Sequence, residues 1–437
     1  HSASHTTTPS SHTFTGNIYY DGNINKLHVN FNADFSDSGY KKETNVNESS
    51  QNDPAFIENL SDGVARMGAG KLVLSYPIWK GMFKIGTEET YVSAKQEYNS
   101  TKTEIPSSKA KIAENNISGF AEYALPFKYV QVVAGIRYEH VDFEYTNECS
   151  PKDNISRTHN NWFPSFNAST KIGPVGVNIG YTTKIKRPRY DQLSTEMQYN
   201  NRFLYQTGDP TLLNEIQNTL SLNANWRWLT LTGAYEVVDN AIYQLGYPYD
   251  DDCTAMVKYS NAKETVRKLN IYLNASPTVG IWNPRYTVGM EKQYFETTVI
   301  DPRESTGTRV VKRNDPMFFV QANNSFKLKQ GWLIDLDYQY TSPFDYVMYK
   351  FTKPKHGLNL AVSKSFLKHD ALNVRLAWND ILNKTKEHVC TDYGNFIHNQ
   401  NNDYYSPSVQ LRLSYRFNTA NSKYKGTGAG ADAKSRM

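Results

Sequence analysis

The last strand-like stretch of the chain alternates strictly between apolar and polar side chains. One face would carry Val409, Leu411, Leu413, Tyr415 and Phe417, and the other Ser408, Gln410, Arg412, Ser414 and Arg416. A period of two over this stretch indicates an extended strand with one face in an apolar medium and the other in a polar one. Comparable alternation recurs in about 17 stretches, many of them roughly 9–12 residues long, which is enough to cross a bilayer at a tilt. The pattern predicts an all-β fold, an antiparallel transmembrane β-barrel.

The connections between these stretches alternate in length. The short ones are 21–25, 80–81, 126–127, 173–174, the junction near Arg227, 276–280, 328–331 and 367–370; the long ones are 37–68, 99–112, 145–160, 187–214, 242–263, 299–314, 342–354 and 381–405. Outer-membrane barrels have short periplasmic turns and long external loops. We therefore expect the long loops to be extracellular and the C-terminus periplasmic. The expected division is a disordered or external segment at 1–12, the barrel at 13–417 and a periplasmic tail at 418–437.

The composition fits a barrel better than a soluble or helical membrane protein. Only 39% of the 437 residues are hydrophobic, and no run approaches the ~20 apolar residues of a spanning helix. Aromatic residues nevertheless reach 13%, with 31 tyrosines, as expected where tyrosines collect at both membrane interfaces. Five tryptophans (Trp79, Trp226, Trp228, Trp282 and Trp332) lie beside short turns, and Trp162 and Trp378 near the opposite rim. This distribution disfavours a soluble all-β adhesin.

Other function classes find little support in the sequence. The net charge of +5 comes from 48 basic and 43 acidic residues, without the basic stripe of a nucleic-acid-binding protein. Cys149, Cys253 and Cys390 are scattered, so they suggest no metal site and at most one internal disulfide. The acidic run 250–252 and the histidines His5 and His12 lack the spacing of metal ligands. No hydrolase or metalloprotease motif occurs. We predict no enzyme activity, metal or cofactor. The chain opens without a signal peptide, so its N-terminus is expected to be processed or cut.

The segment from Lys184 to Trp226 resembles the characteristic segment of the TonB-dependent receptors, a family of outer-membrane β-barrels. The matching residues are Arg187, Pro188, Tyr190, Leu193, Gly208, Pro210, Leu213 and Glu215. Asp209 replaces the usual asparagine, and Asn214-Glu215 replaces Pro-Glu. Residues 69–81, 115–123, 134–145, 376–385 and 415–430 are also similar to members of this family.

This resemblance implies a transporter of the Gram-negative outer membrane, set in outer-membrane lipid. Such barrels have about 22 strands, and one lacking about five at its start would leave about 17. The resemblance further implies an N-terminal plug domain and a TonB-type energy-coupling protein acting through a part outside this chain. The implied activity is import of a substrate that the sequence does not identify. The alternative is a structural barrel that scaffolds surface lipoproteins through loops such as 37–68 and 187–214.

Alternation also predicts charged side chains that face the lumen. These candidates are Asp34, Arg137, Glu139, Glu236, Asp335, Asp337, Arg375, Arg412 and Arg416. In a plugged barrel most of them would bond the plug or each other, and a minority would contact substrate. Two interpretations of the segment 187–214 remain open, a loop that folds back over the rim and a loop that contacts ligand. Pro188 would end the strand before it, because proline has no N–H for the ladder.

Overall fold

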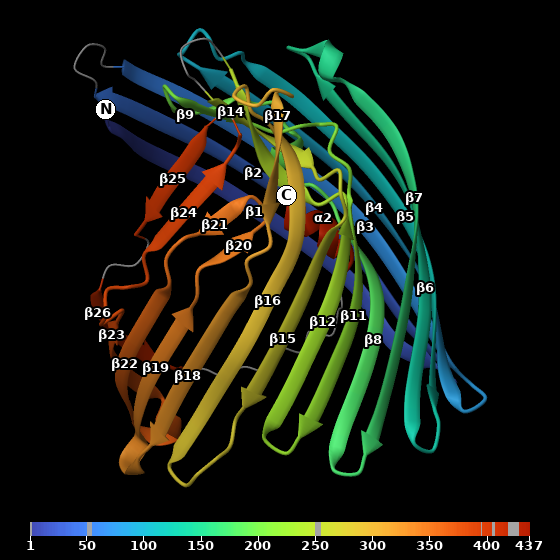
Figure 1. Cartoon of the computed structure of the whole chain (residues 1–437). Helices are drawn as coiled ribbons and strands as arrows, with labels where there is room; N and C mark the ends of the chain where they lie inside the picture. The colour runs from blue at the N-terminus through green and yellow to red at the C-terminus, as the bar shows by residue number, and fades with distance from the viewer. Residues whose placement is uncertain (1, 50–54, 250–254, 395, 404–406, 418–427) are drawn as a thin grey trace.

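A long antiparallel sheet forms the wall of the molecule (Figure 1). The computed structural model describes residues 2–49, 55–249, 255–394, 396–403, 407–417 and 428–437. The wall strands are β1 (Ser2–Ile24), β2 (Leu27–Ser49), β3 (Ala55–Ile78), β4 (Gly81–Ser100), β5 (Ser108–Pro126), β6 (Val130–Asn147), β7 (Ile155–Ile172), β8 (Val175–Lys186), β11 (Glu215–Trp226), β12 (Leu229–Asp239), β15 (Val266–Ala275), β16 (Trp282–Ile300), β18 (Met317–Lys327), β19 (Trp332–Thr341), β22 (Lys355–Phe366), β23 (Leu372–Asn379) and β26 (Ser408–Tyr415).

The strand number agrees with the sequence pattern. The sheet has 18 strands, one of which, β17 (Thr308–Arg313), pairs only with the far end of β16. The other 17 pair in chain order, each antiparallel to the next, which confirms the predicted fold class. Among the described residues, β1 pairs with β2 and β26 with β23, and these two strands are the edges of the sheet. The expected total of 22 strands stays a prediction.

The outer face of the wall carries a continuous apolar band. Register places Leu336 beside Leu360, Leu360 beside Trp378, and Trp378 beside Val409, so one row crosses four strands. All four side chains are exposed. Exposed apolar rows are unfavourable in water but suit a lipid-facing surface. The alternation first seen in β26 is thus an alternation between the two sides of the wall.

The predicted short connections are tight turns between consecutive wall strands. Asn25, Trp79 and Arg227 adopt positive φ angles of 54°, 53° and 52°, and Gly173 has a φ of 58°. Two-residue hairpin turns need such left-handed residues because their twist then matches that of the strands. Since the strands are antiparallel, all short turns lie at one end of the wall and the long connections at the other.

The strands at the N-terminal side are longer than expected. The expected loop 37–68 is mostly strand, because β2 continues to Ser49 and β3 begins at Ala55. Residues 1–12 were expected to be disordered or a loop, but β1 begins at Ser2 and pairs with β2 along its length. Polar side chains such as Thr7 and Thr44 cover this part, so it shows no apolar period although its register with β2 is unbroken.

The later long connections fold into two small sheets. The first contains β9 (Gln198–Asn201), β10 (Leu204–Thr207), β13 (Ile242–Pro248) and β14 (Ala255–Asn261). The second contains β20 (Phe344–Tyr346), β21 (Tyr349–Phe351), β24 (Glu387–Asp392) and β25 (Ile397–Asn402). Both lie at the end of the wall opposite the short turns (Figure 1). The described parts of the connections 187–214, 242–263, 342–354 and 381–405 therefore contain strands and are not open loops throughout.

The C-terminal residues do not form the expected periplasmic tail. Helix α2 (Ala431–Arg436) lies inside the curve of the wall (Figure 1). Its side chains bond Asp34 on β2 and Glu114 on β5. The expectation of a tail at 418–437 is wrong for 428–437, while 418–427 lie outside the described residues. No helix in the described part of the chain is long and apolar enough to cross a membrane.

A small apolar core lies on the inner side of the wall. The wall contributes Ala65, Met67, Ala69, Val92, Ala94, Ala110, Ile112, Phe143 and Tyr145; the segment after β8 contributes Tyr190, Leu193 and Leu212; the C-terminal segment contributes Ala429 and Ala433. Burial of apolar surface stabilises this contact by about 25 cal/mol per Å². The core therefore fixes two segments distant in sequence against the same patch of wall.

Cysteine labelling should distinguish the two ends of the wall. Cys149 is exposed and free beside the long-connection end, and Cys390 lies half-buried in β24. Cys253 lies outside the described residues. We expect a membrane-impermeant maleimide to label Cys149 on intact cells. A Lys80→Cys variant, at a short turn, should be labelled only after the outer membrane is breached. Labelling of both positions on intact cells would contradict the assignment.

Candidate functional site

The segment that follows β8 begins with a buried arginine. Arg187 donates to Glu139 Oε2 at 2.5 Å and to Asp432 Oδ2 at 2.8 Å. Pro188 is also buried, and its carbonyl accepts from Arg436 Nε at 3.1 Å. Strand β8 ends at Lys186, as expected because proline has no N–H for the ladder. The first two residues of the motif thus join the wall to the C-terminal segment.

The next residues form the short helix α1 (Tyr190–Leu193). The backbone N–H of Arg189 donates to Gln192 Oε1 at 2.9 Å, which caps the helix. Tyr190 and Leu193 point into the inner core, and the Arg436 guanidinium lies 4.7 Å from the Tyr190 ring centre. The two motif residues of this turn are therefore packing residues.

A tight backbone contact closes the segment. Gly208 N–H donates to Ser194 O at 3.0 Å, and Asp209 N–H donates to Gln192 O at 2.7 Å. A side-chain Cβ at position 208 would lie 2.3 Å from Gln192 O and 2.4 Å from Ser194 O, so only glycine fits. Asp209 also accepts from the Thr211 backbone N–H at 2.9 Å, an aspartate turn. Pro210 is buried beside it.

The end of the segment is fastened to the neighbouring strands. Leu212 is buried in the inner core, whereas Leu213, the residue that matched the motif, is exposed. Glu215 accepts from the Ile242 backbone N–H at 2.7 Å and from Lys186 Nζ at 3.2 Å. We call residues 187–215 the clasp loop, because it is held at both ends and in the middle.

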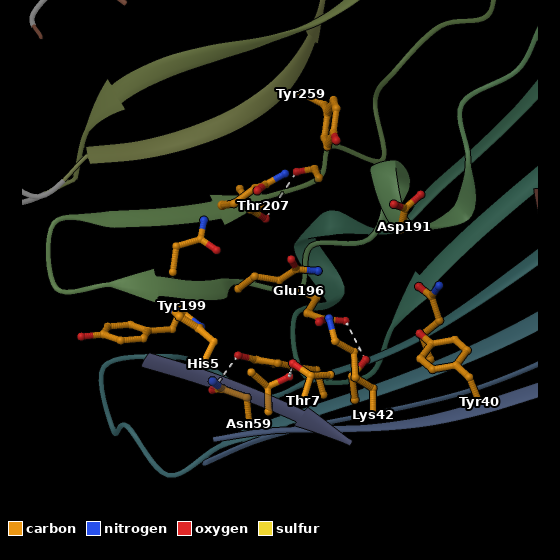
Figure 2. A pocket seen from close by; sticks show the side chains of 18 residues that line it. His5, Thr7, Tyr40, Lys42, Asn59, Asp191, Glu196, Tyr199, Thr207 and Tyr259 are labelled. Carbon is orange, nitrogen blue, oxygen red and sulfur yellow. Dashed lines mark hydrogen bonds between the residues drawn. The ribbon is translucent and has the colours of Figure 1, made fainter. Parts of the chain in front are cut away.

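A polar cavity of about 370 Å³ lies between the clasp loop and the inner side of β1 to β4. Figure 2 shows the loop residues Thr207 and Glu196 facing Lys42 and Thr7 of the wall strands. The lining residues are His5, Thr7, Tyr40, Lys42, Thr44, Asn59, Ser61, Gln96, Tyr98, Asp191, Glu196, Gln198, Tyr199, Asn200, Gln206, Thr207, Gly208 and Tyr259. The oxygen Oε1 of Gln96 is buried and has no hydrogen-bond partner among the described residues.

Tyrosines and amides dominate this cavity. Tyr98 donates to Asn59 Oδ1 at 3.0 Å, which fixes its ring at the cavity wall. Tyr199 and Tyr205 pack edge to face, with ring centres 5.4 Å apart. Amides and hydroxyls both donate and accept hydrogen bonds, and tyrosine rings offer apolar faces. Such a lining suits an uncharged, hydrogen-bonding ligand.

Comparison with known proteins agrees with this architecture. Residues 21–415 match the model of the outer membrane protein beta-barrel family. The chain belongs to this family. The comparison with curated proteins gives no match.

Solved structures of similar fold include one transporter and two receptors. The copper transporter OprC is 10% identical, with a TM-score of 0.57 over 86% of this chain and 67% of that one. The ferric-catecholate import receptor Fiu from K12 E. coli is 12% identical, with a TM-score of 0.60 over 93% of this chain and 64% of that one. The ferric preacinetobactin receptor BauA from Acinetobacter baumannii is 12% identical, with a TM-score of 0.58 over 94% of this chain and 63% of that one. The chain spans about two thirds of these structures. At such identities the likeness shows the fold, and it confirms the resemblance to the barrels of TonB-dependent receptors.

This outer-membrane barrel brings only some of the predicted lumen charges together. Glu139 bonds Arg137 and Arg187, and Asp34 bonds Lys434. A second group pairs Asp335 Oδ2 with Arg375 Nη1 at 2.5 Å. Glu236 and Asp337 are half-buried, and Asp337 interacts electrostatically with Asp335 and Arg375 of the second group. Arg412 and Arg416 are exposed at the edge of the wall. Some of the predicted charges therefore form two separate groups, the others join neither, and together they do not form one site.

The sequence reasoning missed several residues of these sites. Glu114, Asp432, Lys434 and Arg436 all bond at the C-terminal segment, which was expected to be a tail. Glu196 of the cavity lies outside the motif match. Its neighbours Tyr98 and Gln96 lie on β4, at the polar end of a strand where alternation is weak. Within the described residues no group of three or more histidine, cysteine or acidic side chains could hold a metal ion, and the run 250–252 lies outside them.

Glu196 should make the stability of the protein depend on pH. Burial raises the pKa of Glu196 from 4.5 to about 7, while Lys42 opposes this shift. Because the pKa of Glu196 is higher in the folded state than in the unfolded state, the folded state binds the proton more tightly. The resulting stabilisation is complete below pH 4.5 and is lost as the pH rises to about 7, where folded Glu196 ionises. We expect Glu196→Gln to raise the unfolding temperature at pH 8 and to leave it nearly unchanged at pH 4.5. Semi-native gel electrophoresis after heating measures this.

The matched control is Glu58→Gln, at an exposed position of β3. It should change the unfolding temperature at neither pH. An equal effect of Glu196→Gln at both pH values would contradict the shifted pKa.

Proposed function

We propose that this chain forms the wall of an outer-membrane importer and that the polar cavity binds part of the imported substrate. The observation that carries this proposal is the place of the cavity. It lies on the inner side of the wall, at the end with the long connections, between β1–β4 and the clasp loop. A substrate entering the lumen from that end would meet it first.

The lining indicates what part of a substrate would bind. No arginine lies among the lining residues, and the charged ones are Lys42, Asp191, Glu196 and, when protonated, His5. Anionic groups are usually bound by arginine forks. Hydroxyl-rich or amide-rich groups match the tyrosines and amides better. Proteins of this fold include a copper transporter, a ferric-catecholate import receptor and a ferric preacinetobactin receptor, so the fold class serves varied substrates.

Transport would need elements beyond the wall. Open sheet edges are costly in lipid, where water cannot satisfy backbone groups. We therefore propose that further strands cover the edges at β1 and β26, that a plug domain fills the lumen, and that a TonB-type protein energises it. The long connections would be extracellular and the short turns periplasmic.

A scaffold for surface lipoproteins is the second candidate. The second small sheet favours it, because it offers a folded surface above the wall. Arg309 fastens this sheet by bonding both oxygens of Asp392, at 2.8 and 2.9 Å. Such a rigid platform would suit a protein partner better than a small ligand.

Energised uptake tests the proposal. Cells that produce the full-length native protein would be given an uncharged maltooligosaccharide, a neutral peptide or a ferric catecholate, with and without an uncoupler. We expect uptake of one of the first two to depend on the proton gradient and to fall at least tenfold in Gln96→Leu. The control Gln400→Leu, exposed on β25, should import normally. No energised uptake of any probe, together with a lipoprotein that co-purifies stoichiometrically, would favour the scaffold.

A further inference from the structure

The residues from Gly428 onward are bound to the inner wall through their backbone. Three consecutive N–H groups donate to three wall side chains: Gly428 to Asn32 Oδ1 at 3.1 Å, Ala429 to Asp34 Oδ2 at 2.7 Å and Gly430 to Glu88 Oε1 at 2.7 Å. Two of these acceptors are carboxylate oxygens and the third is an amide oxygen, and hydrogen bonds from backbone N–H groups to carboxylates are strong and directional. The wall therefore binds the backbone of residues 428–430 directly, in addition to the side chains of the segment.

The basic side chains of α2 reach carboxylates on the same face of the wall. Lys434 Nζ lies 2.5 Å from Asp34 Oδ1. Arg436 makes a two-pronged contact with Glu114, at 2.7 and 3.0 Å, and both side chains are almost completely buried. Planar two-pronged pairs combine charge with a defined geometry. A cationic segment with this spacing therefore matches the carboxylates of β2, β4 and β5.

Shape restricts this contact further. Gly430 has a φ of 64°, and a Cβ there would lie 2.7 Å from Met67 Sδ and 2.9 Å from Ala69 Cβ. The positive φ and the lack of space for a Cβ both favour glycine at position 430. Ala429 and Ala433 are small enough to enter the apolar core. The site therefore accepts a glycine turn followed by alanines and spaced basic residues.

The clasp loop covers the bound segment from the other side. Arg187 donates to Asp432, Pro188 O accepts from Arg436, and the Tyr190 ring lies against the Arg436 guanidinium. Helix α2 is thus held by polar contacts on two sides, from the wall and from the clasp loop. Arg436 in particular contacts the wall and the clasp loop at once.

We propose that residues 428–437 are an internal closing segment, that the carboxylate-lined face of β2, β4 and β5 is its docking site, and that the clasp loop locks it there. While docked, the segment narrows the lumen beside the polar cavity. Its release opens this part of the lumen and frees the clasp loop. The proposal rests on the proposed role of the lumen as a conduit.

The wall chemistry supports a site built for this occupant. Glu114 accepts two hydrogen bonds from Arg436, and Asp34 bonds Asn17 in addition to the segment. Removing one partner of a buried ion pair leaves an uncompensated charge, which is strongly destabilising. Without the segment Glu114 would lose its two-pronged arginine contact and Asp34 its lysine, whereas Glu88 would keep Lys71 of the wall at 3.7 Å. The docking site therefore favours the docked segment until another ligand competes for the same carboxylates.

The test uses thiol labelling in outer-membrane vesicles that carry the full-length native protein. Cys149, Cys253 and Cys390 are changed to serine, and Ala433→Cys places a thiol at a buried position of α2. In this background Arg436→Glu should raise the rate of maleimide labelling at position 433 at least tenfold. Adding Glu114→Arg should restore slow labelling by reversing the pair. Ser435→Ala, at an exposed position of α2, should leave the rate unchanged.

Conductance in planar bilayers tests the closing role. Arg436→Glu should raise the open-channel conductance, and the reversed pair should lower it again. Unchanged labelling in Arg436→Glu would overturn the docking site. Faster labelling without higher conductance would overturn the closing role. A compact band in semi-native gels shows that the variants fold, and Lys434→Gln provides a milder second variant. The labelling result does not depend on uptake, so a failure of the importer proposal would be seen separately.

Discussion

Replacing Arg187 by methionine is expected to lower the stability of the folded protein by about 3 kcal/mol, the range found when one partner of a buried ion pair is removed. The side chains of Arg187 and Glu139 are 2% and 1% exposed, and Arg187 also bonds Asp432. Methionine fills similar space but leaves Glu139 with Arg137 as its remaining basic contact. The unfolding temperature, read from semi-native gels after heating, should fall by several degrees.

Arg189 provides the matched control two residues away. It pairs with Asp191 at 2.7 Å, but the two side chains are 55% and 54% exposed. Exposed ion pairs contribute between zero and about 1 kcal/mol, because water already solvates both charges. Arg189→Met should therefore shift the unfolding temperature little. Equal losses in the two variants would show that burial does not decide the effect, and the clasp loop would then be a weak contact.

The wall could be predicted because a strand with one face in lipid alternates between apolar and polar side chains. Val409, Leu411 and Leu413 are all exposed on the outer face of β26, as their spacing predicted. The short turns followed from the same pattern, since each lies where the alternation stops. Trp79 and Arg227 both lie at such positions, with left-handed backbone. Local pattern was enough wherever one face of a strand meets lipid.

The alternation of apolar and polar residues did not reveal strands whose two faces both lack contact with lipid. Thr7 and Thr44 lie opposite one another in β1 and β2, in a region that looked like loop because both faces are polar. The C-terminal segment failed for a different reason. Its partners, among them Asp34, lie about 400 positions earlier in the chain, and a six-residue helix has no periodicity to reveal them. Contacts of such range depend on the curvature of the wall, which brings distant strands to one inner face and which no local sequence window contains.

The clasp loop was recognised by motif but not in its role. The motif match named Leu213, whereas the leucine that enters the core is its neighbour Leu212. The difference follows from the turn at Asp209 and Pro210, which sets which side chain faces inward. The two interpretations of this loop also divide along its length. Arg187 and Tyr190 contact the C-terminal segment, whereas later residues of the loop, among them Glu196 and Thr207, line the cavity.

Replacing Gly208 by alanine is expected to open the clasp loop, at a cost of about 1–3 kcal/mol or more, as for overpacked interiors. The added Cβ would lie 2.3 Å from one backbone oxygen and 2.4 Å from another. Backbone oxygens cannot rotate away as a flexible side chain can, so Gln192 and Ser194 must separate from Gly208. The hydrogen bonds from Gly208 and Asp209 would then be lost.

Limited proteolysis reports this opening directly. Trypsin should cleave after the exposed Arg189 at least tenfold faster in Gly208→Ala, and the polar cavity should lose its loop side. The control is Gly233→Ala on β12, where a Cβ meets no atom within 4 Å. That variant should cleave at the native rate, because wall strands tolerate alanine where space is free. If both variants behave alike, the close contact at Gly208 does not hold the loop. If only Gly208→Ala is cleaved faster and also loses energised uptake, the same glycine closes the loop and shapes the cavity.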